Sequence, residues 1–451
     1  MTTRLNPVDA ALSRVRSAVA AELSDRRRMS QLESSAPLTE ANERALAESL
    51  VWTELDLVAR SRANKGESAF DSATEELILE RVLADLFGLG ALEYLLADES
   101  IEDIFINGCD NVIVSRSGGG RERVGRIAES DDALVELLNT WASRLGRTER
   151  RFDTSNPRLD LKLPGGFRLH AIMEVSPRPT VTIRCPRHTK VSLGDLVGLG
   201  SMDQHLADLL SAAVRARCNI IVAGGTGAGK TTLLRALIHE IPSEERLVTI
   251  EDTSELNLGM FPEAHPNVAE LETRDENVEG KGAITMAQLT KECLRMSPDR
   301  VIVGEVRGAE ALAMLKAMSQ GNDGSMCTLH AESCRGVASR VRGYCAEAAN
   351  QLPMPVIDGF YRTAVDMVVH LHKTLDRRRV ISSLVQVTEE GTDGIKYNDL
   401  YMRDASGRAE LASLPGGRLR ERLVLAGLDV ERMAWLLEQQ KATAGQTGVA
   451  R

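Results

Sequence analysis

The second half of the chain alternates between short apolar runs and stretches with helical periodicity. Apolar residues follow one another without alternation in four runs that we interpret as buried strands, at residues 219–223, 246–251, 300–304 and 325–330. Apolar residues three and four apart predict helices at residues 201–217, 232–238, 286–296 and 309–319. Strands that alternate with helices form parallel sheets, which bind ligands at the carboxyl ends of their strands. We therefore predict an α/β domain here.

Further elements follow this alternation. A meander of additional strands is expected at residues 365–371, 379–388 and 396–402, followed by an amphipathic helix at residues 419–439 and a polar tail. The helix at 201–217 is expected to open with a capping box from Ser201 to Gln204.

The first half begins with helical periodicity and then becomes mixed. Helices are predicted at residues 1–27, 38–63 and 72–87, with a polar linker at 30–37. The third helix is expected to open with a capping box from Ser72 to Glu75 and to end at Gly88. Strands are predicted at residues 101–106, 111–116, 159–163, 167–172 and 180–184, with a helix at 134–145. We expect four parts: a helical extension (1–70), a smaller α/β domain (71–190), the main α/β domain (191–410), and a C-terminal helix and tail (411–451).

Composition restricts the class of protein. The net charge of −10 and an aromatic content of 3% disfavour a polyanion-binding surface and base-stacking platforms. The seven cysteines form no C-x-x-C pair and no Cys/His metal spacing, which is typical of a reducing compartment. No apolar run approaches the ~20 residues of a membrane span, and the N-terminus lacks a signal-peptide pattern. We expect a cytoplasmic protein that contacts a membrane only through partners.

A phosphate-binding loop is the most specific motif. It fits G-x-x-x-x-G-K-[ST] between a predicted strand and a predicted helix. Its residues are Gly224, Gly225, Thr226, Gly227, Ala228, Gly229, Lys230, Thr231 and Thr232. The glycines let backbone N–H groups converge on a polyphosphate, and the start of the helix adds further donors. Lys230 is expected to reach the β- and γ-phosphates, and Thr231 to offer its hydroxyl to Mg²⁺.

Acidic residues and a histidine end the neighbouring strands. Glu251, with Asp252 and Glu255 after it, ends one strand, and Glu305 ends another. Such acids are often merely solvated, but two on successive strands of a phosphate-loop sheet favour roles in holding Mg²⁺ and orienting water. His330 ends a further strand at the same expected edge, where it could sense the γ-phosphate.

Taken in order, these motifs resemble the type II/IV secretion system ATPases, specifically their CpaF-like (Tad pilus) branch. The loop resembles the family's Walker A motif, residues 249–256 its aspartate box, residues 294–307 its atypical Walker B motif and residues 321–331 its histidine box. Residues 274–282, together with Gly88-Leu-Gly-Ala-Leu-Glu, Asp98 and residues 104–108, resemble markers of the CpaF-like branch. The resemblance covers roughly residues 75–400.

The resemblance implies a RecA-like P-loop NTPase domain preceded by a smaller α/β N-terminal domain and a helical extension. It implies a homo-hexamer that hydrolyses ATP with Mg²⁺ to power pilus assembly or protein secretion through an inner-membrane platform. Thr231 and Glu305 would serve the metal, Glu251 would activate water and His330 would sense the γ-phosphate. Arg168 and Arg184 resemble N-terminal-domain arginines that approach the phosphates, and Arg274 and Arg307 are further candidates.

One departure keeps alternatives open. Asn322 stands where the family's histidine box often has a histidine, and an amide cannot carry a proton or charge at neutral pH. A nucleotide-gated scaffold with little turnover therefore stays open. A RecA-like nucleic-acid translocase is the alternative within the enzymes, although the acidic balance disfavours it.

Overall fold

The computed structural model describes residues 7–32, 40–90, 92–117, 119–145, 151–185, 190–274, 276, 280–347, 352–374, 376, 378–388 and 394–447. The chain divides into two compact units, Met1–Arg187 and His188–Arg451, and each is described by itself. Most of the predicted linker and the last four residues of the tail lie outside the described residues. No helix in the described ranges is long and apolar enough to cross a membrane.

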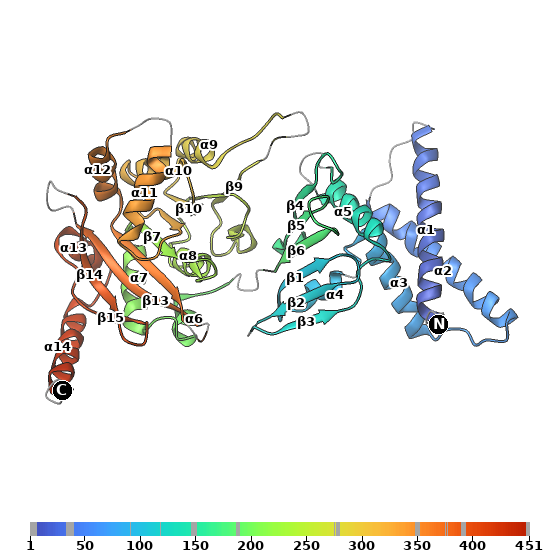
Figure 1. Cartoon of the computed structure of the whole chain (residues 1–451), viewed down its shortest axis with the longest axis horizontal. Helices are drawn as coiled ribbons and strands as arrows, with labels where there is room; N and C mark the ends of the chain where they lie inside the picture. The colour runs from blue at the N-terminus through green and yellow to red at the C-terminus, as the bar shows by residue number, and fades with distance from the viewer. Residues whose placement is uncertain are drawn as a thin grey trace. The chain divides into compact units, whose positions relative to one another are not determined.

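The first unit begins with a three-helix bundle (Figure 1). Its helices are α1 (Pro7–Leu32), α2 (Glu40–Asn64) and α3 (Ser72–Phe87). Each contributes apolar residues to one shared core, among them Val15, Val51 and Ile78. Burial of one apolar stripe per helix explains why three helices pack here.

An antiparallel six-stranded sheet completes the first unit, in the order β3-β2-β1-β6-β5-β4. Its strands are β1 (Ile101–Asn107), β2 (Val112–Arg116), β3 (Arg121–Val124), β4 (Arg158–Lys162), β5 (Arg168–Ile172) and β6 (Thr180–Arg184). The helices α4 (Leu92–Ala97) and α5 (Asp131–Leu145) share its core, into which Trp141 is buried. The hairpin turn at Pro164–Gly166 forms as predicted, with Gly165 at a φ of +80°.

The second unit is built on a nine-stranded sheet, in the order β15-β14-β13-β12-β7-β11-β10-β8-β9. The strands from β12 to β9 are parallel, and β12 to β15 form an antiparallel meander. The strands are β7 (Ile220–Gly224), β8 (Leu247–Glu251), β9 (Val268–Glu272), β10 (Arg300–Val306), β11 (Met326–Leu329), β12 (Met367–Lys373), β13 (Arg379–Thr388), β14 (Lys396–Arg403) and β15 (Ala409–Leu411).

Helices cover both faces of this sheet, and this arrangement confirms the predicted α/β fold (Figure 1). One core is shared by α6 (Leu193–Gly198), α7 (Gln204–Arg215), α8 (Lys230–Ile238), α13 (Gly417–Leu425) and α14 (Val430–Thr447). The other is shared by α9 (Met286–Cys293), α10 (Glu310–Ser319), α11 (Gly336–Glu347) and α12 (Met354–Ala364). The central strand β7 is buried on both faces, so it reads as an unbroken apolar run.

Several predicted helix ends are corrected. Asp71, not Ser72, caps α3, because its carboxylate accepts the Thr74 N–H at 2.8 Å. Asp203, not Ser201, caps α7 in the same way. The single predicted helix near the C-terminus is two helices, α13 and α14, with Gly427 between them at a φ of +91°.

Other elements carry no clear pattern and were not predicted. The strands β3 and β9 contain no fully buried residue, so they lack the apolar alternation that reveals a strand. The helices α11 and α12 contain glycines or many polar residues, which weakens helical periodicity. The short elements α4, α6 and β15 fall in the same class.

Candidate functional site

The phosphate-binding loop forms between β7 and α8, as the motif predicts. Gly224 ends β7 against β12, where a Cβ would lie 2.7 Å from the carbonyl oxygen of Leu371. Gly229 has a φ of +97° and leads directly into α8, which begins at Lys230. Glycine meets both requirements without strain. The free N–H groups at the start of α8 thus close the loop, an arrangement that binds anions.

Lys230 lies inside the loop. Its side chain is buried, and Nζ donates to the carbonyl oxygens of Gly224 and Gly225 at 3.2 Å each. Nζ also lies 3.3 Å from both ring nitrogens of His330. Burial lowers the pKa of Lys230, while the nearby carboxylates of Glu305 and Glu255 act in the opposite direction. The loop therefore holds a cation whose present partners are weak neutral acceptors, which phosphate oxygens would replace with stronger charge-assisted bonds.

Glu255 is the acid that reaches the loop. The Thr231 hydroxyl donates to Glu255 Oε2 at 2.9 Å. Glu251, which we had expected to activate water, is only 3% exposed, and its carboxylate accepts the N–H groups of Glu255 at 2.8 Å and Leu256 at 3.1 Å. A Cβ atom on Gly304 would lie only 2.8 Å from the Cγ of Glu251. The Glu251 carboxylate thus binds the backbone of the segment that carries Glu255, and its expected role in activating water stays a prediction.

Glu305 joins His330 and Arg307 at the carboxyl ends of β10 and β11. Its Oε1 lies 2.7 Å from His330 Nε2, and its Oε2 accepts a hydrogen bond from Arg307 at 2.6 Å. Arg307 also lies 3.7 Å from Asp252, beyond the end of β8. Burial lowers the pKa of His330 and Lys230 lowers it further, while Glu305 opposes both. The predicted gathering of Lys230, Glu305 and His330 at one sheet edge is therefore observed.

The residues around Thr231 suit a Mg²⁺ ion. Among the described residues, no group of three or more His, Cys, Asp or Glu side chains forms a metal cage. Mg²⁺ uses few protein ligands when it binds with a nucleotide, and prefers oxygen donors. The Thr231 hydroxyl, which contacts the Glu255 carboxylate, offers such a donor.

The candidate arginines lie in different places. Arg168 and Arg184 are cross-strand neighbours on β5 and β6 of the first unit, where Arg184 is 65% exposed and lies 3.7 Å from Asp103. Their approach to a nucleotide stays a prediction. Arg274 donates to the carbonyl oxygen of Gly282 at 2.6 Å. Much of the branch marker around Arg274, namely residues 275 and 277–279, lies outside the described residues.

Arg379 is a contact that the sequence did not reveal. Its Nε donates to the carbonyl oxygen of Gly227 at 3.1 Å, so the first residue of β13 touches the loop. No motif contains this residue, and no sequence signal connects positions 152 residues apart.

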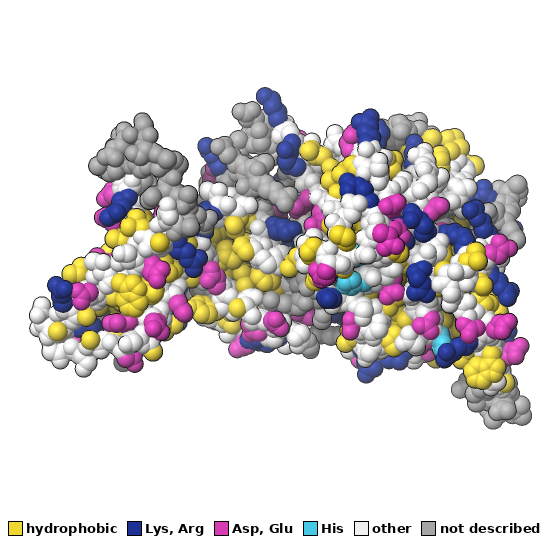
Figure 2. All heavy atoms as spheres, turned by 180° about the vertical axis from the view of Figure 1, so that it is seen from behind, with side chains coloured by type: hydrophobic (Ala, Val, Ile, Leu, Met, Phe, Trp, Pro, Cys, Tyr) yellow, Lys and Arg dark blue, Asp and Glu magenta, His cyan; other side chains and the backbone are white. Residues whose placement is uncertain are grey.

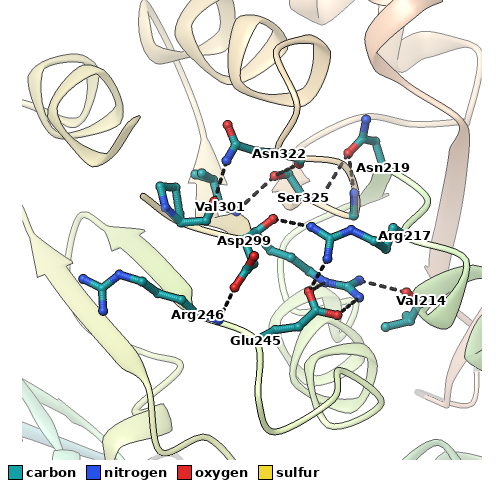
Figure 3. Close-up of polar contacts among 12 residues, drawn as sticks. Val214, Arg217, Asn219, Glu245, Arg246, Asp299, Val301, Asn322 and Ser325 are labelled. Atoms are coloured by element: carbon teal, nitrogen blue, oxygen red, sulfur yellow. Dashed lines mark hydrogen bonds and ion pairs between the residues drawn. The ribbon is translucent and has the colours of Figure 1, made fainter. Parts of the chain in front are cut away.

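His330 follows β11 at the carboxyl edge of the sheet, whereas Asn322 lies before the same strand at the amino edge. Figure 3 shows the contacts of Asn322. Its Nδ2 donates to the carbonyl oxygen of Pro298 at 2.6 Å. Ser325 donates to the carbonyl oxygen of Asn322 at 2.6 Å and accepts the Val301 N–H at 3.0 Å. Asn322 therefore closes a turn at the amino edge of the sheet, whereas the phosphate loop lies at the carboxyl edge.

A buried ion pair organises the same edge (Figure 3). Arg300 is fully buried and binds both carboxylate oxygens of Glu245, at 2.8 and 2.7 Å. It also donates to the carbonyl oxygen of Val214 at 2.8 Å. A Cβ on Gly324 would lie 2.6 Å from this guanidinium, which explains the glycine two residues after Asn322. The first half of the segment that resembles a histidine box is thus structural.

Comparison with known proteins shows the family of this chain. A family model described as "Type II/IV secretion system protein" matches residues 86–399. The chain is 33% identical to the conjugal transfer protein TrbB of Rhizobium radiobacter over 307 residues, which are 67% of this chain and 88% of that protein. It is 31% identical to the type IV secretion system protein VirB11 of Brucella suis over 326 residues, covering 66% of this chain and 88% of that protein.

The crystal structure of the VirB11 ATPase from the Brucella suis type IV secretion system, in complex with sulphate, matches 65% of this chain and 96% of its own at 30% identity. The TM-score is 0.35.

Proposed function

Because the chain belongs to the type II/IV secretion system protein family and is an ATP-hydrolysing enzyme, we propose that it is the motor of a secretion or pilus system. The observation that carries this proposal is the meeting of Lys230, His330 and Glu305 at the phosphate loop. These contacts join the loop to the ends of two other strands, where a γ-phosphate would enter.

Each side chain has a role in this proposal. Lys230 exchanges the carbonyls of Gly224 and Gly225 for phosphate oxygens, and His330 then contacts the γ-phosphate. Glu255 orients the attacking water, while Glu251 holds the backbone that carries Glu255. Bound with ATP, Mg²⁺ would neutralise phosphate charge, held by the Thr231 hydroxyl with Glu305 near its outer shell.

Loss of the γ-phosphate would then change the contacts at the ends of two strands at once. Glu305 is shared between His330 and Arg307, so a change at His330 alters the charge around Arg307 and Asp252. We propose that this rearrangement drives the motion of one domain against the other, with Arg168 and Arg184 contacting the nucleotide from the N-terminal domain. The four-part division at residues 70, 190 and 410 belongs to the same proposal.

The finer assignment is a homo-hexamer of the CpaF-like (Tad pilus) branch that acts at the inner face of the cell membrane through platform proteins. The segments around Gly88 and Arg274, which resemble markers of the CpaF-like branch, support this assignment. Light scattering of the purified full-length chain with ATP tests the assembly, because a hexamer predicts six times the chain mass of 49.1 kDa. A monomer at all protein concentrations would contradict it.

A nucleic-acid translocase is less well supported. On the face shown in Figure 2, basic and acidic side chains are interspersed instead of forming a basic stripe. The net charge of −10 also disfavours a polyanion partner. The ATPase rate should rise with vesicles of phosphatidylethanolamine and phosphatidylglycerol that carry the platform protein, and should not respond to duplex DNA. Stimulation by DNA alone would favour the translocase.

A further inference from the structure

A buried histidine lies on the strand next to the phosphate-loop strand and has no role in the proposed hydrolysis of ATP. His370 is on β12, next to Ala223 of the phosphate-loop strand β7, and is 7% exposed. Its Nδ1 lies 2.7 Å from Ser382 Oγ. Burial lowers the pKa of His370, and a hydrogen bond with the backbone of Ala331, the residue after His330, acts in the opposite direction. His370 therefore connects the strand that ends in the loop to the segment that carries His330.

A β-bulge places Ser382 against this ring. In the β12–β13 pairing, His370 faces Ser383 and Leu371 faces Ile381, so Ser382 is an extra residue without a partner. Its side chain is buried, and its hydroxyl also donates to the carbonyl oxygen of His370 at 3.1 Å. Bulges next to active sites commonly re-aim a side chain. Here the bulge turns a hydroxyl onto the imidazole, in a place where a regular strand would present an ordinary cross-strand pair.

The segment after His330 is tied down at a second point. Cys334 is buried, and its Sγ lies 3.3 Å from the carbonyl oxygen of Val368 and 3.3 Å from Ser383 Oγ. Since β7 lies between β11 and β12, residues 331–334 cross β7 to reach these contacts. The contacts at Ala331 and Cys334 thus hold both ends of the crossing, and His330 is the residue at its start.

We propose that His370 and Ser382 are positioning residues that hold His330 at the phosphate site. The contacts run from Ser382 through His370 to the Ala331 backbone, and His330 in turn lies 3.3 Å from Lys230 Nζ and 2.7 Å from Glu305. A side chain that contacts a γ-phosphate must be held in place, and groups behind it commonly supply that restraint. This inference rests on the proposed role of His330.

Substitution of His370 should lower turnover without changing nucleotide affinity, and this difference tests the inference. His370→Leu keeps the volume but removes the hydrogen bonds, so kcat should fall about tenfold to a hundredfold. The affinity for ADP should stay unchanged, because ADP has no γ-phosphate. His370→Gln, which can still hydrogen-bond the Ala331 backbone, should recover part of the loss. Ser382→Ala removes only the hydroxyl and provides a second test if His370→Leu does not fold.

Controls separate positioning from general damage. Val369→Ala lies on the same strand but packs into the opposite core, so it should lower stability and leave kcat unchanged. In a His330→Ala background, His370→Leu should have no further effect on kcat. An equal fall in both backgrounds, or no fall in the wild-type background, would overturn the inference. A wild-type kcat in His330→Ala alone would instead contradict the proposed role of His330.

Discussion

The Thr231 hydroxyl donates to Glu255 Oε2 at 2.9 Å, which makes Glu255 the acid in direct contact with the predicted metal ligand. Glu251, four residues earlier, has its carboxylate turned to the N–H groups of Glu255 and Leu256. The two acids of one short segment therefore differ in environment: Glu255 contacts the phosphate loop, and Glu251 contacts backbone N–H groups. Different environments allow two carboxylates to have different roles.

Glutamine substitutions should separate these two acids. Glu255→Gln keeps an oxygen that can accept from Thr231, so ATP binding should persist while kcat falls about a hundredfold or more. Glu251→Gln leaves ATP binding largely intact but should lower the free energy of unfolding by roughly 1–3 kcal/mol, because a buried charged acceptor of two N–H groups is lost. Nucleotide titration, steady-state turnover and urea unfolding measure the three quantities. A Glu255→Gln enzyme with the wild-type kcat would show that another group orients water.

Asn322→His should not increase turnover. Asn322 lies at the amino edge of β11, away from His330, and its amide bonds the carbonyl oxygen of Pro298. The substitution should leave kcat unchanged and cost about 1 kcal/mol of stability through the lost hydrogen bond. A clear rise in kcat would mean that the asparagine limits hydrolysis, as the scaffold alternative requires.

Gly324→Ala should destabilise the second unit. Gly324 has a φ of +88°, and its Cβ would lie 2.6 Å from the buried Arg300 guanidinium. We expect a loss of roughly 1–3 kcal/mol in urea unfolding with no change in the KM for ATP. Gly343→Ala is the matched control, because this glycine lies in α11 with no atom within 4 Å of its Cβ position. It should be neutral or stabilise by up to about 1 kcal/mol. Equal effects at both sites would argue against the clash with Arg300.

Acid should destabilise the protein through His265. This residue is 3% exposed, neither ring nitrogen has a hydrogen-bond partner among the described residues, and its ring stacks on that of His239 at 5.9 Å between centroids. Burial lowers the pKa of His265 below its ordinary value of 6.5, and His239 lowers it further. The unfolded chain therefore takes up a proton first, so this contribution to stability is present above pH 6.5 and is lost as the pH falls below it.

His265→Phe should weaken this dependence, because it replaces the ring with one that cannot titrate. Urea unfolding of both proteins between about pH 5 and pH 8 gives the two slopes. Identical slopes would show that other groups, such as His330 and His370, whose pKa values are also lowered by burial, carry the dependence.

The phosphate loop and the parallel strands other than β9 were predictable from the sequence, because they depend on local patterns. Unbroken apolar runs mark strands buried on two faces, and the loop is one contiguous motif. The meeting of His330 with Glu305 also followed, since strand ends share one edge of a parallel sheet. The contacts of Glu251 and Glu255 did not follow, because they depend on how one turn folds back after β8.

Contacts between distant segments could not be predicted from the sequence. Arg379 touches Gly227 across 152 residues, and Ser382 reaches His370 only because of a bulge. Neither contact leaves a periodic trace in the residue pattern. Asn322 is a related case. Its motif spans β11, so the two ends of the motif lie on opposite edges of the sheet.

Steady-state release of phosphate from ATP with Mg²⁺, compared between the purified wild-type chain and Lys230→Ala, tests whether the phosphate loop supports ATP hydrolysis. We predict turnover by the wild-type chain and none above background in the variant, because Lys230 is the only described lysine inside the loop. Equal rates in the two proteins, or no turnover by the wild-type chain as a full-length assembly, would contradict it.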